Sequence, residues 1–277
     1  MNDKITLILP DIHHKCERAE RIIKSEGADE VILLGDYFDD FNDTPEQVTE
    51  TCEWLSMSVN KPNRIHLFGN HDTHYAYNYG TFKCSGFEQW KKFIVDDTVP
   101  RDVWEKLKWF HVLDNTWLIT HAGLHNTYIP KEIIPLLSFH KDRPLFFNKL
   151  ENFLNEEIEE GFKSAANNIP HWILNAGACR GGRQRFGGIT WCDFQQELSP
   201  FIGLNQICGH TPNRTVRWKC LRKGSAADIP NTNGSGIPEL NSHNDLSHST
   251  NVCLDTHLMH YAIWNGKELV IKNYINI

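Results

Sequence analysis

Short groups of aspartate, histidine and asparagine recur along the 277-residue chain, each just after an apolar run. Together, carboxylate, imidazole and amide groups can bind divalent transition metals, and two such metals can activate water and hold a phosphoryl group. A single group of this kind also fits an ordinary turn after a strand, so the ordered recurrence is the informative feature. The five groups are Asp11-x-His13, Gly35-Asp36-x-x-Asp39, Gly69-Asn70-His71-Asp72, His121 and Gly209-His210.

Apolar runs alternate with helix-forming sequence over the first 70 residues. This strand–helix order predicts a mainly parallel sheet with helices on its faces, where ligands bind beyond the carboxyl ends of the strands. The polar groups of this region fall at those ends. The predicted strands are 5–9, 31–34 and 65–68, and the predicted helices are 15–26 and 45–59, the second with Thr44 as N-cap before a proline.

After the first 70 residues, the strand-like and helix-like segments alternate less regularly. We expect one domain over residues 1–277, with pocket elaborations near 73–110 and an exposed polar loop near 224–250. Asn265-Gly266 predicts a hairpin turn near the end of the chain. The further predicted helices are 87–95, 102–109 and 147–165, and the further predicted strands are 116–120, 205–208, 252–254, 261–264 and 269–272.

Composition narrows the class of protein. A net charge of −7 disfavours binding to a membrane surface or to nucleic acid in general, although a local basic patch for nucleic acid stays open. Eight cysteines stand singly, without a Cys-x-x-Cys pair, which indicates free thiols in a reducing compartment. The apolar run at the N-terminus is too short to span a bilayer. We therefore expect a cytoplasmic protein without a membrane partner, and the oligomeric state is left open.

In their order, the five polar groups resemble the signature of the calcineurin-like metallophosphoesterases: D-x-H, G-D-x-x-D, G-N-H-[D/E], a histidine after a strand, and G-H. The resemblance implies an α/β fold, a four-layered αββα sandwich with a dinuclear metal site at the C-terminal ends of the strands. It also implies two divalent metal ions, with Mn²⁺ expected first and iron or zinc as alternatives. The implied reaction is direct attack on phosphorus by a hydroxide that bridges the two ions.

The resemblance also assigns roles to individual residues. His71 is expected to be the catalytic acid, with Asp39 holding its other ring nitrogen. Asp72 is expected to hold the turn, and His74 receives no role. In the alternative reading, Asp36 or Asp39 caps a helix and His210 is a core histidine. The implied metal ligands are Asp11 and His13 for the first ion, Asp36 as the bridge, and Asn70, His121 and His210 for the second ion.

The branch of the family is suggested by the end of the signature. Nucleases and phosphodiesterases often end in G-H-x-H, whereas this chain has Gly209-His210-Thr211-Pro212. That form is similar to bacterial and phage serine/threonine protein phosphatases and to diadenosine tetraphosphatase-like enzymes. We therefore expect a phosphatase for phosphomonoesters on a phosphoprotein or a nucleotide-type molecule. The alternatives are a phosphodiesterase or nuclease, a dinucleoside polyphosphate hydrolase, and a non-catalytic metal-bound interaction scaffold.

Two phosphate-binding arginines of the protein phosphatases are missing, with Asp40-Phe41 and Phe68 at their positions. A guanidinium is the favoured partner of a phosphate, so another cation is needed. The segment 179–191 combines three arginines with four glycines, and we expect Arg180 or Arg183 to contact the substrate phosphate. His257 stands where relatives carry glycine; it either lies in a loop or lines the pocket as a second proton carrier.

Overall fold

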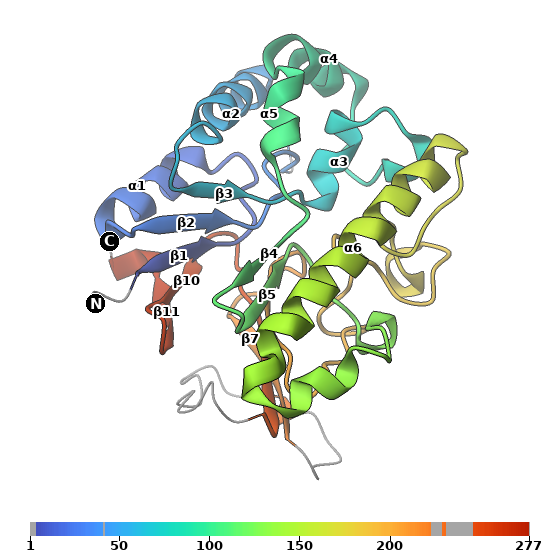
Figure 1. Cartoon of the computed structure of the whole chain (residues 1–277). Coiled ribbons are helices and arrows are strands. Elements are labelled where there is room, and N and C mark those ends of the chain that lie inside the picture. Colours follow the sequence, from blue (N-terminus) through green and yellow to red (C-terminus); the bar gives the residue numbers. More distant parts are fainter. Residues whose placement is uncertain (1–3, 41, 223–228, 231–245, 277) are drawn as a thin grey trace.

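Two mixed β-sheets pack face to face, and helices cover their outer faces (Figure 1). The computed structural model describes residues 4–40, 42–222, 229–230 and 246–276. The expected α/β architecture, an αββα sandwich, is confirmed. The predicted polar loop near 224–250 lies mostly outside the described residues, and its last three residues belong to a strand instead. That residues 1–277 form a single domain stays a prediction.

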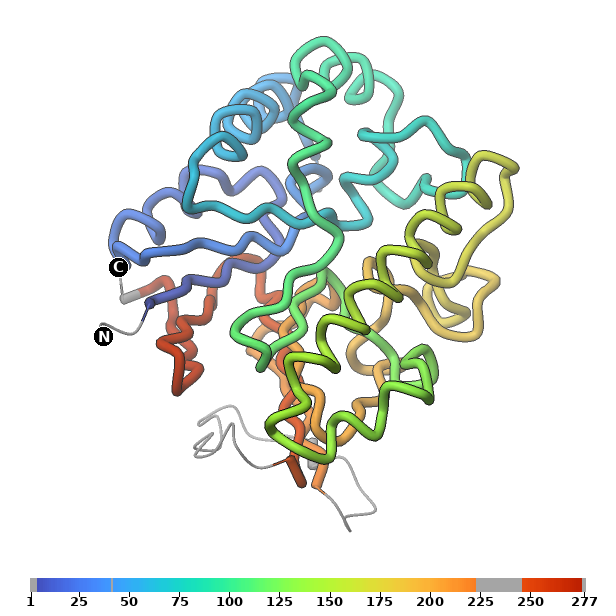
Figure 2. The backbone as a smooth tube through the Cα atoms, viewed as in Figure 1, coloured from blue at the N-terminus to red at the C-terminus, as the bar shows by residue number. Residues whose placement is uncertain are grey.

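The first sheet has the strand order β11-β10-β1-β2-β3. Its three N-terminal strands are parallel, as predicted, while the C-terminal hairpin adds two antiparallel strands. The first and last segments of the described chain therefore share one sheet, as the blue and red parts of the backbone tube show (Figure 2). The strands are β1 (Thr6–Leu9), β2 (Glu30–Leu33), β3 (Arg64–His66), β10 (His260–Trp264) and β11 (Leu269–Asn273).

The second sheet has the order β4-β5-β6-β9-β7-β8, with β5, β6 and β9 parallel and the other pairs antiparallel. The prediction missed β4 and β7, because a four-residue run and a strand rich in arginine and lysine give a weak apolar signal. Pairing with neighbouring strands fixes both. The strands are β4 (Phe110–Leu113), β5 (Trp117–Thr120), β6 (Asn205–Cys208), β7 (Arg217–Arg222), β8 (Ile229–Pro230) and β9 (His248–Cys253).

Helices lie on the outer faces of both sheets. Thr44 and Gln47 form a reciprocal capping box, so the predicted N-cap is confirmed. Predicted helix bounds differ from the observed ones by up to four residues. The α-helices are α1 (Cys16–Glu26), α2 (Pro45–Ser58), α3 (Asn70–Ala76), α4 (Gln89–Thr98), α5 (Arg101–Lys106) and α6 (Arg143–Ala166), and the 3₁₀ helices are Gly80–Phe82, Asn126–Tyr128, Ile134–Ser138, His140–Asp142, Ala178–Arg180 and Tyr274–Asn276.

The core explains why the strand ends are held in place. Leu7 and Leu9 of β1 pack beneath the helices of the first sheet, while Ile8 points into the layer between the two sheets. Successive side chains of a strand alternate between its faces, so β1 is buried on both sides. Among the described residues, no helix is both long and apolar enough to cross a membrane. The eight cysteines are free thiols, and the cytoplasmic location stays a prediction.

Candidate metal centre

Side chains from both sheets meet at the carboxyl ends of the strands. The oxygen Oδ1 of Asn70 lies 2.8 Å from Nδ1 of His210 and 3.1 Å from Nε2 of His121. The same Nε2 of His121 lies 3.3 Å from Oδ2 of Asp36. Asn70 and Asp36 come from the first sheet, and the two histidines come from the second. The residues predicted for the second ion therefore lie together, with Asp36 at their edge.

The residues predicted for the first ion form an overlapping group. Ligand atoms of Asp11, His13 and Asp36 all lie within 4.8 Å of one another, as do those of Asp36, His121 and His210. Nε2 of His13 lies 3.8 Å from Oδ2 of Asp36. Asp36 belongs to both groups. Each group could hold a metal ion, and the two groups share one carboxylate.

The hydrogen bonds of the histidines test whether the site suits cations. Nδ1 of His121 lies 2.8 Å from the carbonyl oxygen of Leu34, and Nδ1 of His13 lies 2.9 Å from that of Phe38. A carbonyl only accepts hydrogen bonds, so Nδ1 of each ring carries a proton, and Nε2 of each ring points toward Asp36. Burial opposes a charged His121, but Asp36 outweighs burial and raises the pKa of His121 to about 9, so the site attracts a proton to Nε2, where a metal ion would otherwise bind. These donors fit two divalent metal ions.

The carboxylates show the same unsatisfied charge. Oδ2 of Asp11 is buried and has no hydrogen-bond partner among the described residues. Burial and the neighbouring carboxylate of Asp255 raise the pKa of Asp11 well above its usual range. Burial also opposes the ionised form of Asp36, but His121 outweighs it and lowers the pKa of Asp36 well below its usual range. Buried negative charge is therefore concentrated where cations would compensate it. Asp255 belongs to none of the five polar groups that the sequence pattern singles out.

Two glycines of the polar groups allow this close packing. A Cβ atom on Gly69 would lie 2.1 Å from Oδ1 of Asp36, and one on Gly209 would lie 2.0 Å from Oδ2 of Asp11. Neither position accepts a larger residue without a shift of the site. Several predicted site residues also have left-handed backbone, which costs about 1–2 kcal/mol for a residue other than glycine. They are His13, Asp36, Asp39 and His210.

His71 lies beside the two groups, in the first turn of α3. Its Nδ1 lies 3.0 Å from Oδ2 of Asp39, and its backbone N–H donates to Oδ1 of Asp36 at 2.9 Å. Burial lowers the pKa of His71, but Asp36 and Asp39 outweigh burial and raise it well above the usual value. A protonated imidazole with Nδ1 held by a carboxylate can donate a proton from Nε2. Asp72 accepts from the backbone N–H groups of residues 36, 37 and 69 at 2.8 Å each, so it holds the turn.

The structure adds residues that sequence reasoning missed. Nε2 of His74 lies 3.1 Å from Oδ2 of Asp39, and Lys91 donates to Oδ1 of Asp39 at 2.9 Å. The signal for His74 was available, because residues three apart on a helix share one face, but the sequence pattern predicts no helix over residues 70–76. No local pattern points to Lys91, which is 52 residues from Asp39.

The predicted arginine segment lies next to the metal ligands. Arg180 donates from Nε to Oδ2 of Asp193 at 2.9 Å, which fixes its guanidinium. A cavity of about 330 Å³ adjoins the candidate metal ligands. Cys84 lines this cavity, and its Sγ lies 3.6 Å from Nδ1 of His71. Trp191 also lines it, and its ring meets the ring of His210 edge-on, with the ring centres 5.7 Å apart. The cationic residues that line this cavity are Lys83, Arg180 and Arg183.

His257 is the predicted substrate residue that lies apart from this cavity. It is exposed on a turn with a left-handed backbone, and its N–H donates to Oδ1 of Asp255 at 3.2 Å. It is not among the residues that line the arginine cavity. A role in substrate binding stays a prediction.

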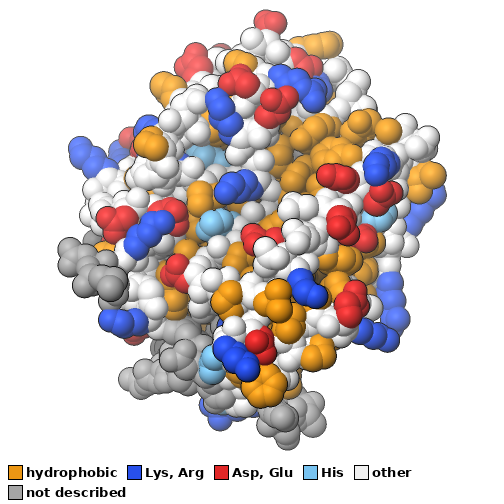
Figure 3. Space-filling view, in the orientation of Figure 1, with side chains coloured by type: hydrophobic (Ala, Val, Ile, Leu, Met, Phe, Trp, Pro, Cys, Tyr) orange, Lys and Arg blue, Asp and Glu red, His pale blue; other side chains and the backbone are white. Residues whose placement is uncertain are grey.

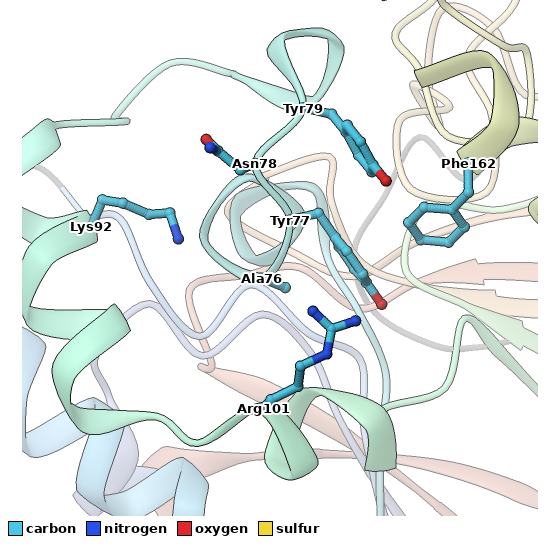
Figure 4. A pocket seen from close by; sticks show the side chains of 7 residues that line it. All are labelled: Ala76, Tyr77, Asn78, Tyr79, Lys92, Arg101 and Phe162. Atoms are coloured by element: carbon cyan, nitrogen blue, oxygen red, sulfur yellow. The ribbon is translucent and has the colours of Figure 1, made fainter. Parts of the chain in front are cut away.

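A second cavity, of about 570 Å³, opens at the C-terminal end of α3 (Figure 4). Tyr77, Tyr79 and Phe162 form its aromatic wall, and hydrophobic side chains gather on the surface between α5 and α6 (Figure 3). Its two cations, Lys92 and Arg101, each pair with a carboxylate four residues away on the same helix. In the arginine cavity, by contrast, Lys83 and Arg183 have no ion pair among the described residues, so that cavity suits a phosphorylated ligand better.

Comparison with known proteins identifies the class. A model of the calcineurin-like phosphoesterase family matches residues 6–214, and the chain belongs to this family. Among solved structures, a protein serine/threonine phosphatase from Saccharomyces cerevisiae is 12% identical with a TM-score of 0.45, over 98% of this chain and 80% of that chain. A metallophosphoesterase from Sphaerobacter thermophilus is 13% identical with a TM-score of 0.44, over 98% and 87% of the two chains. No curated protein matches the chain.

Proposed function

We propose that this phosphoesterase is a phosphatase that uses two divalent metal ions to hydrolyse phosphomonoesters. The observation that carries the proposal is the pair of ligand groups sharing Asp36, with His71 beside them. When bound, two divalent cations activate water and neutralise charge on the phosphoryl group. Mixed carboxylate, imidazole and amide donors favour Mn²⁺, with iron or zinc as alternatives.

The chain's own residues supply binding and proton transfer. Asp11 and His13 would hold the first ion, and Asp36 would contribute to both. His71 would give its Nε2 proton to the leaving-group oxygen, while Asp39 keeps Nδ1 in place. The ligands proposed for the second ion are Asn70, His121 and His210.

The cavity beside the metal ligands supports an anionic substrate. Its three cations, Lys83, Arg180 and Arg183, would attract a phosphorylated peptide or nucleotide-type molecule. Asp193 orients Arg180, so this guanidinium is preorganised to bind a phosphate oxygen. Pro212 stands at the position of the second histidine of G-H-x-H enzymes, and the lack of that histidine favours monoesters over diesters.

The test of the proposed function compares matched substrates. Purified protein loaded with Mn²⁺, Zn²⁺, Fe²⁺ or Mg²⁺ is assayed on a phosphomonoester, its matched diester, a dinucleoside polyphosphate and single-stranded DNA and RNA. We expect the highest kcat/KM on the monoester. Faster diester or nucleic-acid cleavage would make the chain a phosphodiesterase, preference for the dinucleoside polyphosphate would make it that hydrolase, and no turnover with any metal would favour an interaction scaffold.

The acid role of His71 is tested separately. The His71→Asn variant should keep two metal ions per chain but lose turnover on an alkyl phosphate, whose leaving group needs a proton. A 4-nitrophenyl ester has a good leaving group and should be affected less. The control is His140→Ala, an exposed histidine without a proposed role. Unchanged turnover of the alkyl phosphate would reject His71 as the acid.

A further inference from the structure

We propose that Lys91 is a positioning residue for catalysis: its buried ammonium group fixes the Asp39 carboxylate, which in turn orients His71. The proposal rests on the proposed function, in which His71 is the acid. Lys91 lies on α4, in a segment that the sequence indicated only as an elaboration of the pocket. None of the family's signature groups contains it.

The surroundings of Lys91 leave its ammonium group one position. The side chain is 2% exposed. Nζ donates to Oδ1 of Asp39 and to the carbonyl oxygen of Gly86, both at 2.9 Å, and it forms an ion pair with buried Asp43. An ammonium group has three hydrogens, and these three acceptors use all of them. Lys91 is therefore held by two segments of the chain, the loop with Asp39 and Asp43 and the turn with Gly86.

The Asp39 carboxylate is fixed just as fully. Its Oδ1 accepts from Lys91 and from the hydroxyl of Tyr75, the latter at 2.6 Å. Its Oδ2 faces Nδ1 of His71 at 3.0 Å and Nε2 of His74 at 3.1 Å. A carboxylate accepts about four hydrogen bonds, so rotation of Asp39 would break several contacts at once. The direction in which Oδ2 holds the His71 ring is thus set from the opposite side by Lys91 and Tyr75.

A metal ion is the competing explanation for this cluster. Atoms of Asp39, His74 and Cys84 lie close enough to hold one. However, both oxygens of Asp39 are already in contact with donors, and the ammonium of Lys91 supplies the compensating positive charge. A further cation would have to displace these contacts and would be repelled by Lys91. The contacts of Asp39 therefore compensate its charge without an added ion.

The neighbouring lysine provides a matched control. Lys92 donates to the carbonyl oxygen of Tyr75 at 2.9 Å and pairs with exposed Asp96, and it has no contact with Asp39 among the described interactions. We therefore compare Lys91→Met with Lys92→Met, which remove the same charge from adjacent positions of α4. Second-sphere partners of this kind typically contribute 10- to 100-fold to activity.

The experiment measures kcat and KM of both variants on an alkyl phosphate and on its 4-nitrophenyl counterpart. For Lys91→Met we expect kcat on the alkyl phosphate to fall about 10- to 100-fold, a smaller fall on the 4-nitrophenyl ester, and KM and metal content near the parent values. Lys92→Met should match the parent. In the His71→Asn background, Lys91→Met should cause no further loss, because both act through one proton donor.

Several results would overturn the inference. Equal losses on both esters, or loss of bound metal, would mean that Lys91 only supports the fold. Full activity of Lys91→Met on the alkyl phosphate would also reject the positioning role of Lys91. If His71→Asn lowers turnover in the same assay, the proposed function stands even though the inference about Lys91 fails. If Lys91→Met does not fold, Tyr75→Phe removes one donor from the same carboxylate and should lower kcat selectively on the alkyl phosphate. An equal or absent effect of Tyr75→Phe would then reject positioning.

Discussion

Two buried polar clusters lie side by side at the strand ends, and they differ in how their atoms are satisfied. In the candidate metal-ligand cluster, Nε2 of His13 and Nε2 of His121 point toward Oδ2 of Asp36, and one oxygen of Asp11 has no partner among the described residues. In the cluster around Asp39, donors face both carboxylate oxygens. The first cluster offers donor atoms that could hold cations from outside, whereas the second contains its own cation, Lys91. Unpaired acceptors can thus be as informative about function as formed hydrogen bonds.

The largest effect is expected when the carboxylate of Asp36, which both candidate ligand groups share, is removed. Asp36→Asn should lower kcat/KM at least about 1,000-fold, since two-metal charge stabilisation contributes several kcal/mol and each 1.36 kcal/mol is tenfold. Bound metal, measured by mass spectrometry, should fall below two ions per chain. Added Mn²⁺ should raise the Tm of the parent but not of the variant. Asp40→Asn, at an exposed carboxylate after the same strand, is the control; two retained ions in Asp36→Asn would contradict the bridging role.

A buried histidine outside both clusters, His66, shows how a histidine is satisfied where no metal ion is proposed. His66 donates from Nδ1 to the hydroxyl of Tyr37 and accepts at Nε2 from Ser58, both at 3.0 Å, so its neutral ring is fully paired. Burial and nearby Arg64 lower the pKa of His66 to about 3. The negative charge of Glu20 raises this pKa, but its effect is smaller.

The pH dependence of stability follows from that shift. The unfolded chain protonates His66 near pH 6.5, whereas the folded chain does not until about pH 3. Its contribution to stability is therefore fully present above pH 6.5 and is lost as the pH falls toward 3. Between pH 7 and 5 we expect the free energy of unfolding to fall by about 2 kcal/mol, roughly thirty-fold in the folding equilibrium. Urea titrations of the parent and His66→Gln check this; equal pH slopes would contradict it.

The arginine cavity is expected to show a smaller effect. Arg180→Ala should raise KM about tenfold, because a charge-assisted hydrogen bond contributes about 1.5–3 kcal/mol. Arg183→Ala should act in the same direction but less, because Arg183 is exposed and has no anchoring carboxylate among the described contacts. Arg185→Ala, whose guanidinium lies over the ring of Phe186, is the control. Steady-state kinetics decide; unchanged kcat/KM in both variants on every active substrate would remove the cavity from substrate binding.

The smallest effect is expected at the thiol beside the Asp39 cluster. If Lys91 supplies the cation there, Cys84→Ser should change kcat less than about threefold, since the sulfur makes only weak hydrogen bonds, and should leave two metal ions per chain. Metal analysis of parent and variant tests the distinction between the clusters. Three ions in the parent and two in Cys84→Ser would show that the Asp39 cluster also binds metal.

The sequence alone indicated the α/β class and the positions of the metal ligands. Apolar runs that end in Asp11, Asp36 or Asn70 are local patterns, because burial of a strand and the turn after it depend on neighbouring residues. The parallel strand order then predicts that these ends meet at one edge. The structure brings these residues together, along with His121 and His210. Their roles as metal ligands stay proposals.

Only the tertiary structure decided which side chains complete the site. Lys91 contacts Asp39, which is 52 residues away in the sequence, and Asp193 fixes Arg180 within an irregular loop. The strand β7 is not predicted from its sequence, and its pairing with β9 is seen only in the structure. None of these pairings has a local signal, because the energy that forms them comes from burial and charge compensation between distant segments. The chain's local pattern therefore determined where the chemistry lies, and long-range packing determined what orients it.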